Sequence, residues 1–243
     1  MARPLTDFRV LTFDCYGTLI DWETGIWDAL QPLIAANGSG PGRAEVLAVF
    51  GELEAAEERR RPGAPYPEIL AGSHRGVAER FGLTTNDAID AEFGASIPHW
   101  PAFPDSAEAL RTLKASFQLV ILSNVDRTGI AASIRKLGVE FDAVYAAEDI
   151  GSYKPDPQNF AYLLSHLDAE LGLGPSDVLH TAQSLYHDHV PAKAAGLATA
   201  WIDRQHLSAG GSWGATTVVA EHPEPDYVFF TLAELADALP PTG

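Results

Sequence analysis

The chain has 243 residues, 46% of them hydrophobic, which is enough to bury one core or a core with an inserted lobe. Its 33 Asp and Glu residues against 16 Lys and Arg residues give a formal net charge of −17, which argues against a surface for nucleic acid or for an anionic membrane. The single cysteine, Cys15, excludes an intrachain disulfide and a metal site built from several cysteines.

Short apolar runs alternate with longer amphipathic stretches along most of the chain. Strands are expected over 8–13, 118–122, 143–146, 177–181, 198–202 and 227–230. Helices are expected between them over 105–116, 126–137, 157–171 and 188–196. This alternation predicts an α/β fold with a doubly wound, Rossmann-like parallel sheet that carries helices on both faces. Residues 204–226 are rich in Gly, Ser, Thr and Pro, and a long loop is expected there.

Residues 24 to about 97 interrupt this alternation because they have a helical pattern throughout. Helices are expected over 24–36, 44–61, 67–81 and 86–96. Three prolines within 98–104 exclude a helix where this region ends. The chain is therefore predicted to have a helical cap lobe, residues 21–97, inserted after the first strand into an α/β core formed by residues 1–20 and 98–243.

The sequence gives no sign of a membrane segment or of a targeting segment. No stretch approaches 18 uncharged apolar residues, so no transmembrane helix is expected. The first residues lack a basic segment followed by a long apolar run, so no signal peptide is expected. We therefore expect a cytoplasmic protein without a membrane partner.

Polar side chains follow four of the expected strands, at the edge where an open parallel sheet binds ligands. They are Asp14, Tyr16 and Thr18 after the first strand, Ser123 and Asn124 after the second, Lys154 after the third, and Gln183, His187 and Asp188 after the fourth. Because these loops converge, an active site is predicted at this edge.

The same residues resemble the motifs of the haloacid dehalogenase superfamily. The matching strings are FDCYGTLID at 13–21, LSN at 122–124, KPDP at 154–157 and the stretch that ends in Asp188. The resemblance extends from residue 8 to about 203. It implies that Asp14 is a nucleophile that forms a covalent aspartyl intermediate, and that the helical insert closes over the active site. It implies further catalytic roles for Lys154, Asp188, Thr18 and Ser123, and a homodimer.

The sequence departs from the phosphatases of this superfamily at two acidic positions. The second aspartate of their first motif is Tyr16 here, and an acidic residue of their last motif is Gln183. Only Asp14 and Asp188 remain for a divalent cation, which prefers several carboxylate oxygens. A site without metal or other cofactor is therefore expected. The alternative is a phosphatase with an atypical Mg²⁺ site that acts on small phosphomonoesters.

The first motif, Asp-x-Tyr-Gly-Thr, resembles that of the L-2-haloacid dehalogenase branch. In that branch the aspartate displaces halide from the carbon beside a carboxylate, and water cleaves the resulting ester to give a 2-hydroxy acid. The resemblance therefore implies a 2-haloacid dehalogenase whose partner is a short halogenated carboxylate. The candidate substrate-binding residues are Tyr16, Asn124, Gln183, His187 and Trp27.

The match to this branch is incomplete at the positions that bind the substrate and the halide. No arginine occurs at 49–53, where the branch has a cap arginine that takes up the halide. Phe160 replaces an aromatic hydroxyl, and Gln183 and Leu185 replace a serine and an asparagine. A third interpretation is therefore a non-catalytic protein that binds a small carboxylate or a protein partner. The retention of both Asp14 and Lys154 argues against it.

Overall fold

The structure is a computed structural model, and it describes residues 3–212, 214–219 and 222–240. The strands are β1 (Val10–Phe13), β2 (Gln118–Ser123), β3 (Ala143–Ala146), β4 (Val178–Ala182), β5 (Ala198–Ile202) and β6 (Tyr227–Phe229). The α-helices are α1 (Trp22–Ala36), α2 (Arg43–Arg60), α3 (Tyr66–Arg80), α4 (Asp87–Gly94), α5 (Ser106–Lys114), α6 (Arg127–Leu137), α7 (Ala147–Ile150), α8 (Pro157–His166), α9 (Val190–Ala194) and α10 (Leu232–Asp237). Short 3₁₀ or π-helical segments are η1 (Leu5–Asp7), η2 (Ile97–His99), η3 (Leu167–Leu171), η4 (Pro175–Asp177), η5 (Leu185–His189) and η6 (Leu207–Ala209).

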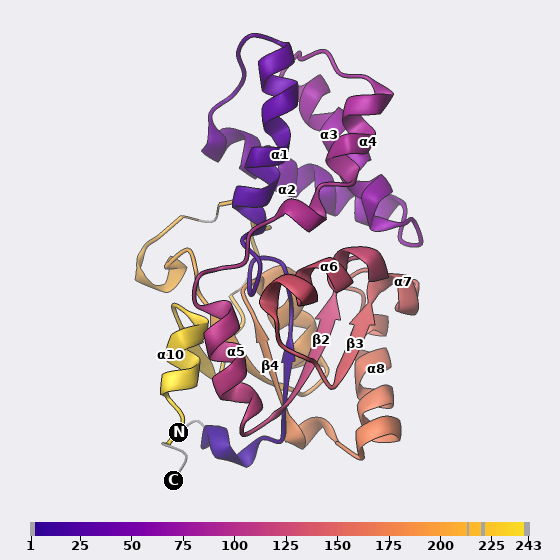
Figure 1. Cartoon of the computed structure of the whole chain (residues 1–243). Helices are drawn as coiled ribbons and strands as arrows, with labels where there is room; N and C mark the ends of the chain where they lie inside the picture. Colours follow the sequence, from indigo (N-terminus) through magenta and orange to yellow (C-terminus); the bar gives the residue numbers. More distant parts are fainter. Residues whose placement is uncertain (1–2, 213, 220–221, 241–243) are drawn as a thin grey trace.

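The described residues form a six-stranded parallel sheet in the order β3-β2-β1-β4-β5-β6 (Figure 1). The chain passes from β1 through β2 to β3 on one side, and from β4 through β5 to β6 on the other. The sheet therefore has its topological switch at the carboxyl end of β1, where such sheets bind ligands. The expected strands are all present, and β6 lies at an edge of the sheet.

Successive residues of the central strands pack on opposite faces of the sheet. Leu11 of β1 and Leu119 of β2 belong to a large core that includes residues of α5, α6 and α10. Val10 and Val120 belong to a second core with residues of α8 and α9. Because both faces are covered, these strands are almost continuously apolar in sequence. The prediction of a doubly wound sheet is confirmed.

Helices α1 to α4 lie together at one end of the molecule, beyond the carboxyl edge of the sheet (Figure 1), and we call them the cap helices. Helix α3 packs against both α2 and α4. Asp21 begins α1 by accepting a hydrogen bond from the Thr24 amide, and Asn86 begins α4 in the same way. The division into a core of 1–20 and 98–243 and a cap of 21–97 stays a prediction.

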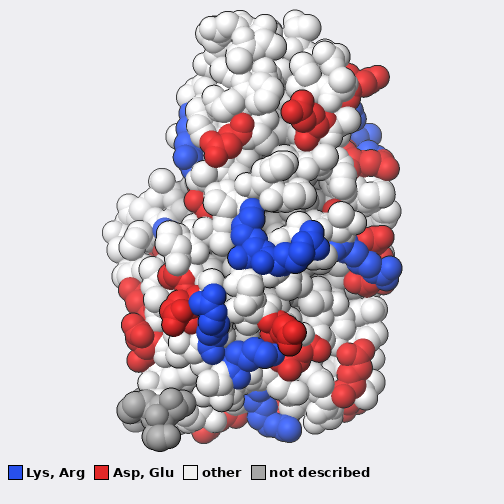
Figure 2. Space-filling model, viewed as in Figure 1, with Lys and Arg blue, Asp and Glu red and all other residues white. Residues whose placement is uncertain are grey.

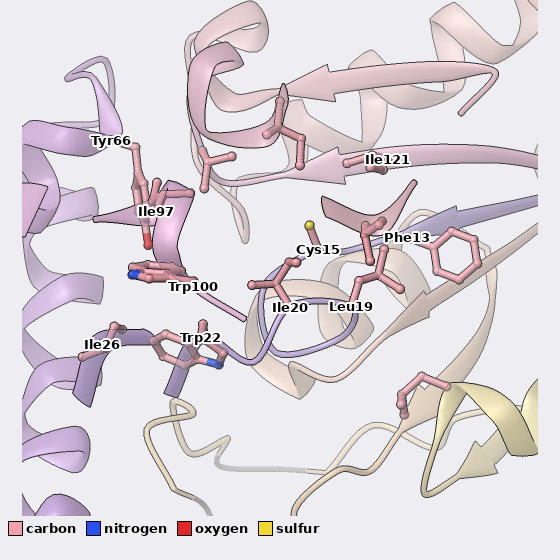
Figure 3. Packing of buried hydrophobic residues seen from close by; sticks show 14 of the residues in the cluster. Phe13, Cys15, Leu19, Ile20, Trp22, Ile26, Tyr66, Ile97, Trp100 and Ile121 are labelled. Atoms are coloured by element: carbon pink, nitrogen blue, oxygen red, sulfur yellow. The ribbon is translucent and has the colours of Figure 1, made fainter. Parts of the chain in front are cut away.

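Trp100 packs at the junction between the cap helices and the sheet (Figure 3). Its ring meets Tyr16 edge to face at 5.4 Å, and its indole N–H donates to Ser96 Oγ at 3.0 Å. Gly25 of α1 lies directly against it, because a Cβ there would come within 2.2 Å of the Trp100 ring. This close packing holds α1 against the loop that carries Tyr16.

The surface is acidic overall but not uniformly so. Figure 2 shows Lys and Arg side chains gathered in a band across the middle of one face, with Asp and Glu around them. Within the described residues, every helix is too short or too polar to cross a membrane.

Candidate active site

Asp14 lies directly after β1, at the topological switch of the sheet, and its side chain is buried. Lys154 Nζ donates to its Oδ1 at 3.0 Å, and Thr18 Oγ1 donates to its Oδ2 at 2.9 Å. Burial raises the pKa of Asp14 above its ordinary value of 3.8, and the Lys154 ammonium opposes that rise. The carboxylate is therefore fixed at both oxygens and poorly solvated, which suits nucleophilic attack.

The Lys154 ammonium is buried and has three hydrogen-bond acceptors. In addition to Asp14 Oδ1, the ammonium donates to Asp188 Oδ1 at 2.6 Å and to the Leu122 carbonyl at 3.1 Å. Burial acts to lower the pKa of Lys154, but Asp14 and Asp188 outweigh it, so the pKa is raised above 10.5. An ammonium has three protons, and all three are used here. Lys154 is thus a fixed cation that orients two carboxylates.

Asp188 lies in η5 and is held as an anion. His180 Nε2 donates to its Oδ1 at 2.9 Å, and Thr12 lies 2.9 Å from His180 Nδ1, an arrangement that requires the ring proton on Nε2. Burial acts to raise the pKa of Asp188, but Lys154 and His180 outweigh it and hold the pKa below its usual range. Its Oδ2 has no hydrogen-bond partner in the described part of the chain. Phe160, which stands where the dehalogenase branch has an aromatic hydroxyl, packs edge to face on the His180 ring.

The two residues at the end of β2 differ in their surroundings. Asn124 lines the cavity and holds the main chain of Lys154, accepting from its N–H at 2.7 Å and donating to its carbonyl at 3.0 Å. Its Nδ2 also lies 3.2 Å from Glu58 Oε1 on α2. Ser123 is buried and outside the described lining of the cavity, and its Oγ has no hydrogen-bond partner among the described residues.

Tyr16 and Gln183 line the cavity, but their polar ends are engaged by other parts of the protein. The Tyr16 hydroxyl is 2.8 Å from Ser133 Oγ on α6, and burial raises its pKa well above 10. Gln183 Nε2 donates to Thr216 Oγ1 at 2.8 Å and to Gln205 Oε1 at 2.5 Å. The structure therefore uses both side chains to shape the wall of the cavity.

His187 lines the cavity with one ring nitrogen free to accept a proton. Its Nδ1 is 3.2 Å from Ser184 Oγ, and its Nε2 is 3.8 Å from Glu58 Oε2, too far for a hydrogen bond. Burial lowers the pKa of His187 to about 4, so the ring is neutral near pH 7. With the ring proton on Nδ1, Nε2 is a free acceptor beside the cavity.

Trp22, and not the predicted Trp27, belongs to the described lining of the cavity. The two lie five positions apart on α1, so they point about 140° apart around the helix and do not share a face. Trp22 Nε1 lies close to Gly17, where a Cβ would come within 2.9 Å of it. Gly17 also has a φ of +92°, which favours glycine, so the turn after Asp14 depends on this residue.

Two glutamates of α2 complete the cavity from the cap side, and the sequence analysis did not select them. Glu54 and Glu58 lie one turn apart and are both buried. Tyr66 donates to Glu54 Oε1 at 2.5 Å. Burial raises the pKa of Glu54 to about 7, and burial with the nearby Glu54 raises that of Glu58 well above 4.5. Their spacing continues the apolar stripe of Leu47 and Phe50, which is the sequence signal that could have found them.

The cavity between the cap helices and the sheet has a volume of about 60 Å³, which suits a molecule of a few heavy atoms. Its described lining holds four carboxyl side chains, with Lys154 as the single Lys or Arg. Residues 215–217 form part of one wall. The segment 204–226, expected to be a long loop, therefore contributes to the site through residues 215–217.

The donors of the cavity do not fit a Mg²⁺ site. Both oxygens of Asp14 accept hydrogen bonds from Lys154 and Thr18, and Oδ1 of Asp188 accepts from Lys154 and His180. Across residues 3–212, 214–219 and 222–240, no three His, Cys, Asp or Glu side chains are grouped so that they could hold a metal ion. A hard divalent cation would have to displace the hydrogen bonds from Lys154, Thr18 or His180 to reach these three oxygens.

The chain is similar in sequence and in fold to several known proteins. The chain is 27% identical over 203 residues to the (S)-2-haloacid dehalogenase H-109 of Pseudomonas putida, a match that covers 80% of this chain and 85% of that protein. It is 33% identical over 135 residues to the pyrophosphatase PpaX of Bacillus velezensis, which is 54% of each chain. The solved structure of the L-2-haloacid dehalogenase from Xanthobacter autotrophicus superimposes with a TM-score of 0.77 at 21% identity, covering 95% of this chain and 97% of that one.

A family model described as haloacid dehalogenase-like hydrolase matches residues 8–196. This segment contains the strand that leads to Asp14, the loop of Lys154 and the turn of Asp188. The chain therefore belongs to the haloacid dehalogenase-like hydrolases.

Proposed function

We propose that the protein is a 2-haloacid dehalogenase that acts without metal through a covalent ester of Asp14. The observation that carries this proposal is the buried pair of Asp14 and Lys154, joined at 3.0 Å, on the floor of a cavity of about 60 Å³. The hydrogen bonds that Lys154 and Thr18 donate to the Asp14 carboxylate support it, and so does the similarity to (S)-2-haloacid dehalogenases. The proposed substrate is a short carboxylate that carries a halogen on its second carbon.

In the first step, a carboxylate oxygen of Asp14 attacks the carbon that bears the halogen. A carbon–oxygen bond forms, the carbon–halogen bond breaks, and the halide leaves with the bonding electron pair. Thr18 and Lys154 hold the carboxylate in place during the attack. Because halide is a good leaving group, the step needs no proton donor of the kind that phosphatases carry where this chain has Tyr16.

In the second step, water attacks the carboxyl carbon of the Asp14 ester. The bond between that carbon and the ester oxygen breaks, and the product alcohol takes one proton of the water. The other proton passes to Nε2 of His187, which is unpaired among the described residues, and from there to solvent, because burial lowers the pKa of this ring to about 4 and it does not retain the proton near pH 7. Oδ2 of Asp188 accepts a hydrogen bond from the attacking water, and Lys154 faces the ester as its fixed cation.

A Mg²⁺-dependent phosphatase is the second candidate, because a pyrophosphatase is among the relatives. Halide release from chloroacetate, fluoroacetate and 2-chloropropionate, each measured with Mg²⁺ and with EDTA, separates the two. We expect halide release that EDTA does not change. Phosphate release from small phosphomonoesters that EDTA abolishes, with no halide released, would select the phosphatase instead.

The non-catalytic interpretation is separated by the same panel. Binding of a small carboxylate without turnover of any halide or phosphate substrate would select it. The homodimer and the cytoplasmic location stay predictions, and sedimentation of the purified protein tests the first of them.

A further inference from the structure

Glu54 and Glu58 face the cavity from the cap helices, whereas Asp14 faces it from the sheet. In a displacement at carbon, the leaving group departs on the side opposite the attacking atom. Attack by Asp14 therefore drives the halide away from the sheet, in the direction of α2. The negative charge moves the same way, from the carboxylate to the departing halide.

Among the described residues, each of the two glutamates has one oxygen that accepts a hydrogen bond and one that does not. Oε1 of Glu54 accepts from the Tyr66 hydroxyl, and Oε1 of Glu58 accepts from Asn124. The hydrogen bonds among the described residues do not include Oε2 of either glutamate, and Oε2 of Glu58 stays 3.8 Å from His187. A proton on Oε2 would turn each side chain into a donor facing the cavity.

The charges around the cavity favour that proton. Lys154 is the one cation in the described lining, and its three protons are already donated to Asp14, Asp188 and a carbonyl. Ionised side chains at Glu54 and Glu58 would place two buried anions close together, and the charges of Lys154 and Arg59 offset only part of the cost of burial. A pair of neutral acids avoids this cost.

Trp22 gives an independent sign that an acceptor binds in this cavity. Its side chain is only 9% exposed and lines the cavity, and its buried indole nitrogen lies near Gly17. Within the part of the chain that the structure describes, this N–H has no hydrogen-bond partner. A buried donor of this kind is normally satisfied, so a ligand acceptor is expected here.

We propose that Glu54 and Glu58 receive the departing halide, to which they donate hydrogen bonds as neutral carboxylic acids, in the role that a cap cation would otherwise fill. The inference rests on the proposed dehalogenase function. Hydrogen bonds to ions are roughly twice as strong as those between neutral groups. Fluoride is the smallest halide and the strongest acceptor, so the contribution is largest for fluorinated substrates.

The protonation of this pair depends on the groups that surround it. Those on α2 itself are Glu54, Glu58 and Arg59. Those on the packed elements are Asp14, Tyr16, Tyr66, Asn124, Tyr153, Lys154, His187 and Asp188. Ionisation of Glu54, whose burial raises its pKa to about 7, would place an anion in the path of the halide. The wild-type kcat/KM for fluoroacetate is therefore expected to fall as the pH rises above about 7.

Two kinds of substitution test the inference by halide release from fluoroacetate and bromoacetate. Glu54→Gln and Glu58→Gln keep a neutral donor at every pH, so the fall in kcat/KM above neutral pH is expected to be lost. Glu54→Met and Glu58→Met remove the donor, so kcat for fluoroacetate is expected to fall about tenfold or more, and kcat for bromoacetate much less. Glu52→Gln, at an exposed position of the same helix, is the matched control and should behave as the wild type.

The inference is overturned if the Gln variants keep the wild-type fall with pH. It is also overturned if the Met variants slow fluoride and bromide release by the same factor, because a merely structural role has that effect. The Gln variants decide the question even if a Met variant does not fold. Failure of the proposed function is distinguishable, since the wild type and Glu52→Gln would then release no halide at all.

Discussion

Asn124 holds the main chain of Lys154 on both sides: it accepts from the Lys154 N–H at 2.7 Å and donates to the Lys154 carbonyl at 3.0 Å. The amide follows β2 and the lysine lies in the loop before α8, so this contact fixes one loop of the site against another. The lysine ammonium then reaches Asp14 from a defined direction.

Asn124→Ala should therefore impair catalysis through the position of Lys154. Loss of both main-chain contacts leaves buried polar groups unpaired, a cost of about 1–3 kcal/mol each. We expect kcat to fall while the protein stays folded, and Asn124→Asp, which keeps only the acceptor, to be impaired as well. Steady-state kinetics and urea unfolding measure the two effects. An unchanged kcat in Asn124→Ala would show that Lys154 does not need this support.

Asp14→Asn is expected to abolish halide release, because an amide is not a nucleophile of the required kind. The loss should be about 10⁴-fold or more, as for other nucleophile deletions. Asp168→Asn, at an exposed position of η3, is the matched control and should keep full activity.

Isotope labelling tests the covalent ester directly. In a single turnover in water enriched in ¹⁸O, the heavy oxygen should enter Asp14, and the product should carry the original protein oxygen. Label that appears in the product of the first turnover, with none in the protein, would contradict attack by Asp14.

The stability of the protein should depend on pH through Glu54. Burial raises its pKa in the folded protein to about 7 from an ordinary value of 4.5, so the folded state binds this proton more tightly than the unfolded chain. The contribution is complete below pH 4.5 and is lost as the pH rises through 7, a change of about 3 kcal/mol. Glu54→Gln lacks it.

Urea unfolding of the wild type and of Glu54→Gln from pH 4 to 8 checks this sign. The wild type should lose unfolding free energy relative to the variant as the pH rises. A constant difference between the two proteins would mean that the pKa of Glu54 is the same in the folded and the unfolded protein.

Gly25→Ala should weaken the packing of α1 against the junction at Trp100. The added Cβ would lie 2.2 Å from the ring of this fully buried residue, so the core must shift. Overpacking of this kind costs about 1–3 kcal/mol. Gly63→Ala is the control, because no described atom lies within 4 Å of a Cβ there. Thermal unfolding compares the midpoint temperatures of the two variants. Equal midpoints would show that the packing at Trp100 adjusts to the added Cβ without a loss of stability.

The sequence alone determined the parallel sheet and the edge of it at which Asp14, Lys154 and Asp188 meet. Each strand is a short apolar run between polar turns, and the alternation of such runs with amphipathic helices is typical of a parallel sheet covered on both faces. The expected bounds of β3 and β5, 143–146 and 198–202, agree with the structure to the residue. Asp14, Lys154 and Asp188 come together because polar residues at the carboxyl ends of parallel strands share one edge.

Only the tertiary structure decided which side chains face the cavity. Helical periodicity places Glu54 and Glu58 on the same face as Phe50, but it does not say what that face packs against. For the same reason, the sequence did not show that Trp22 lines the cavity in place of Trp27. It also did not show that Ser123 lies outside the described lining. A face of a helix becomes core, surface or active site only when a second element, distant in sequence, is placed against it.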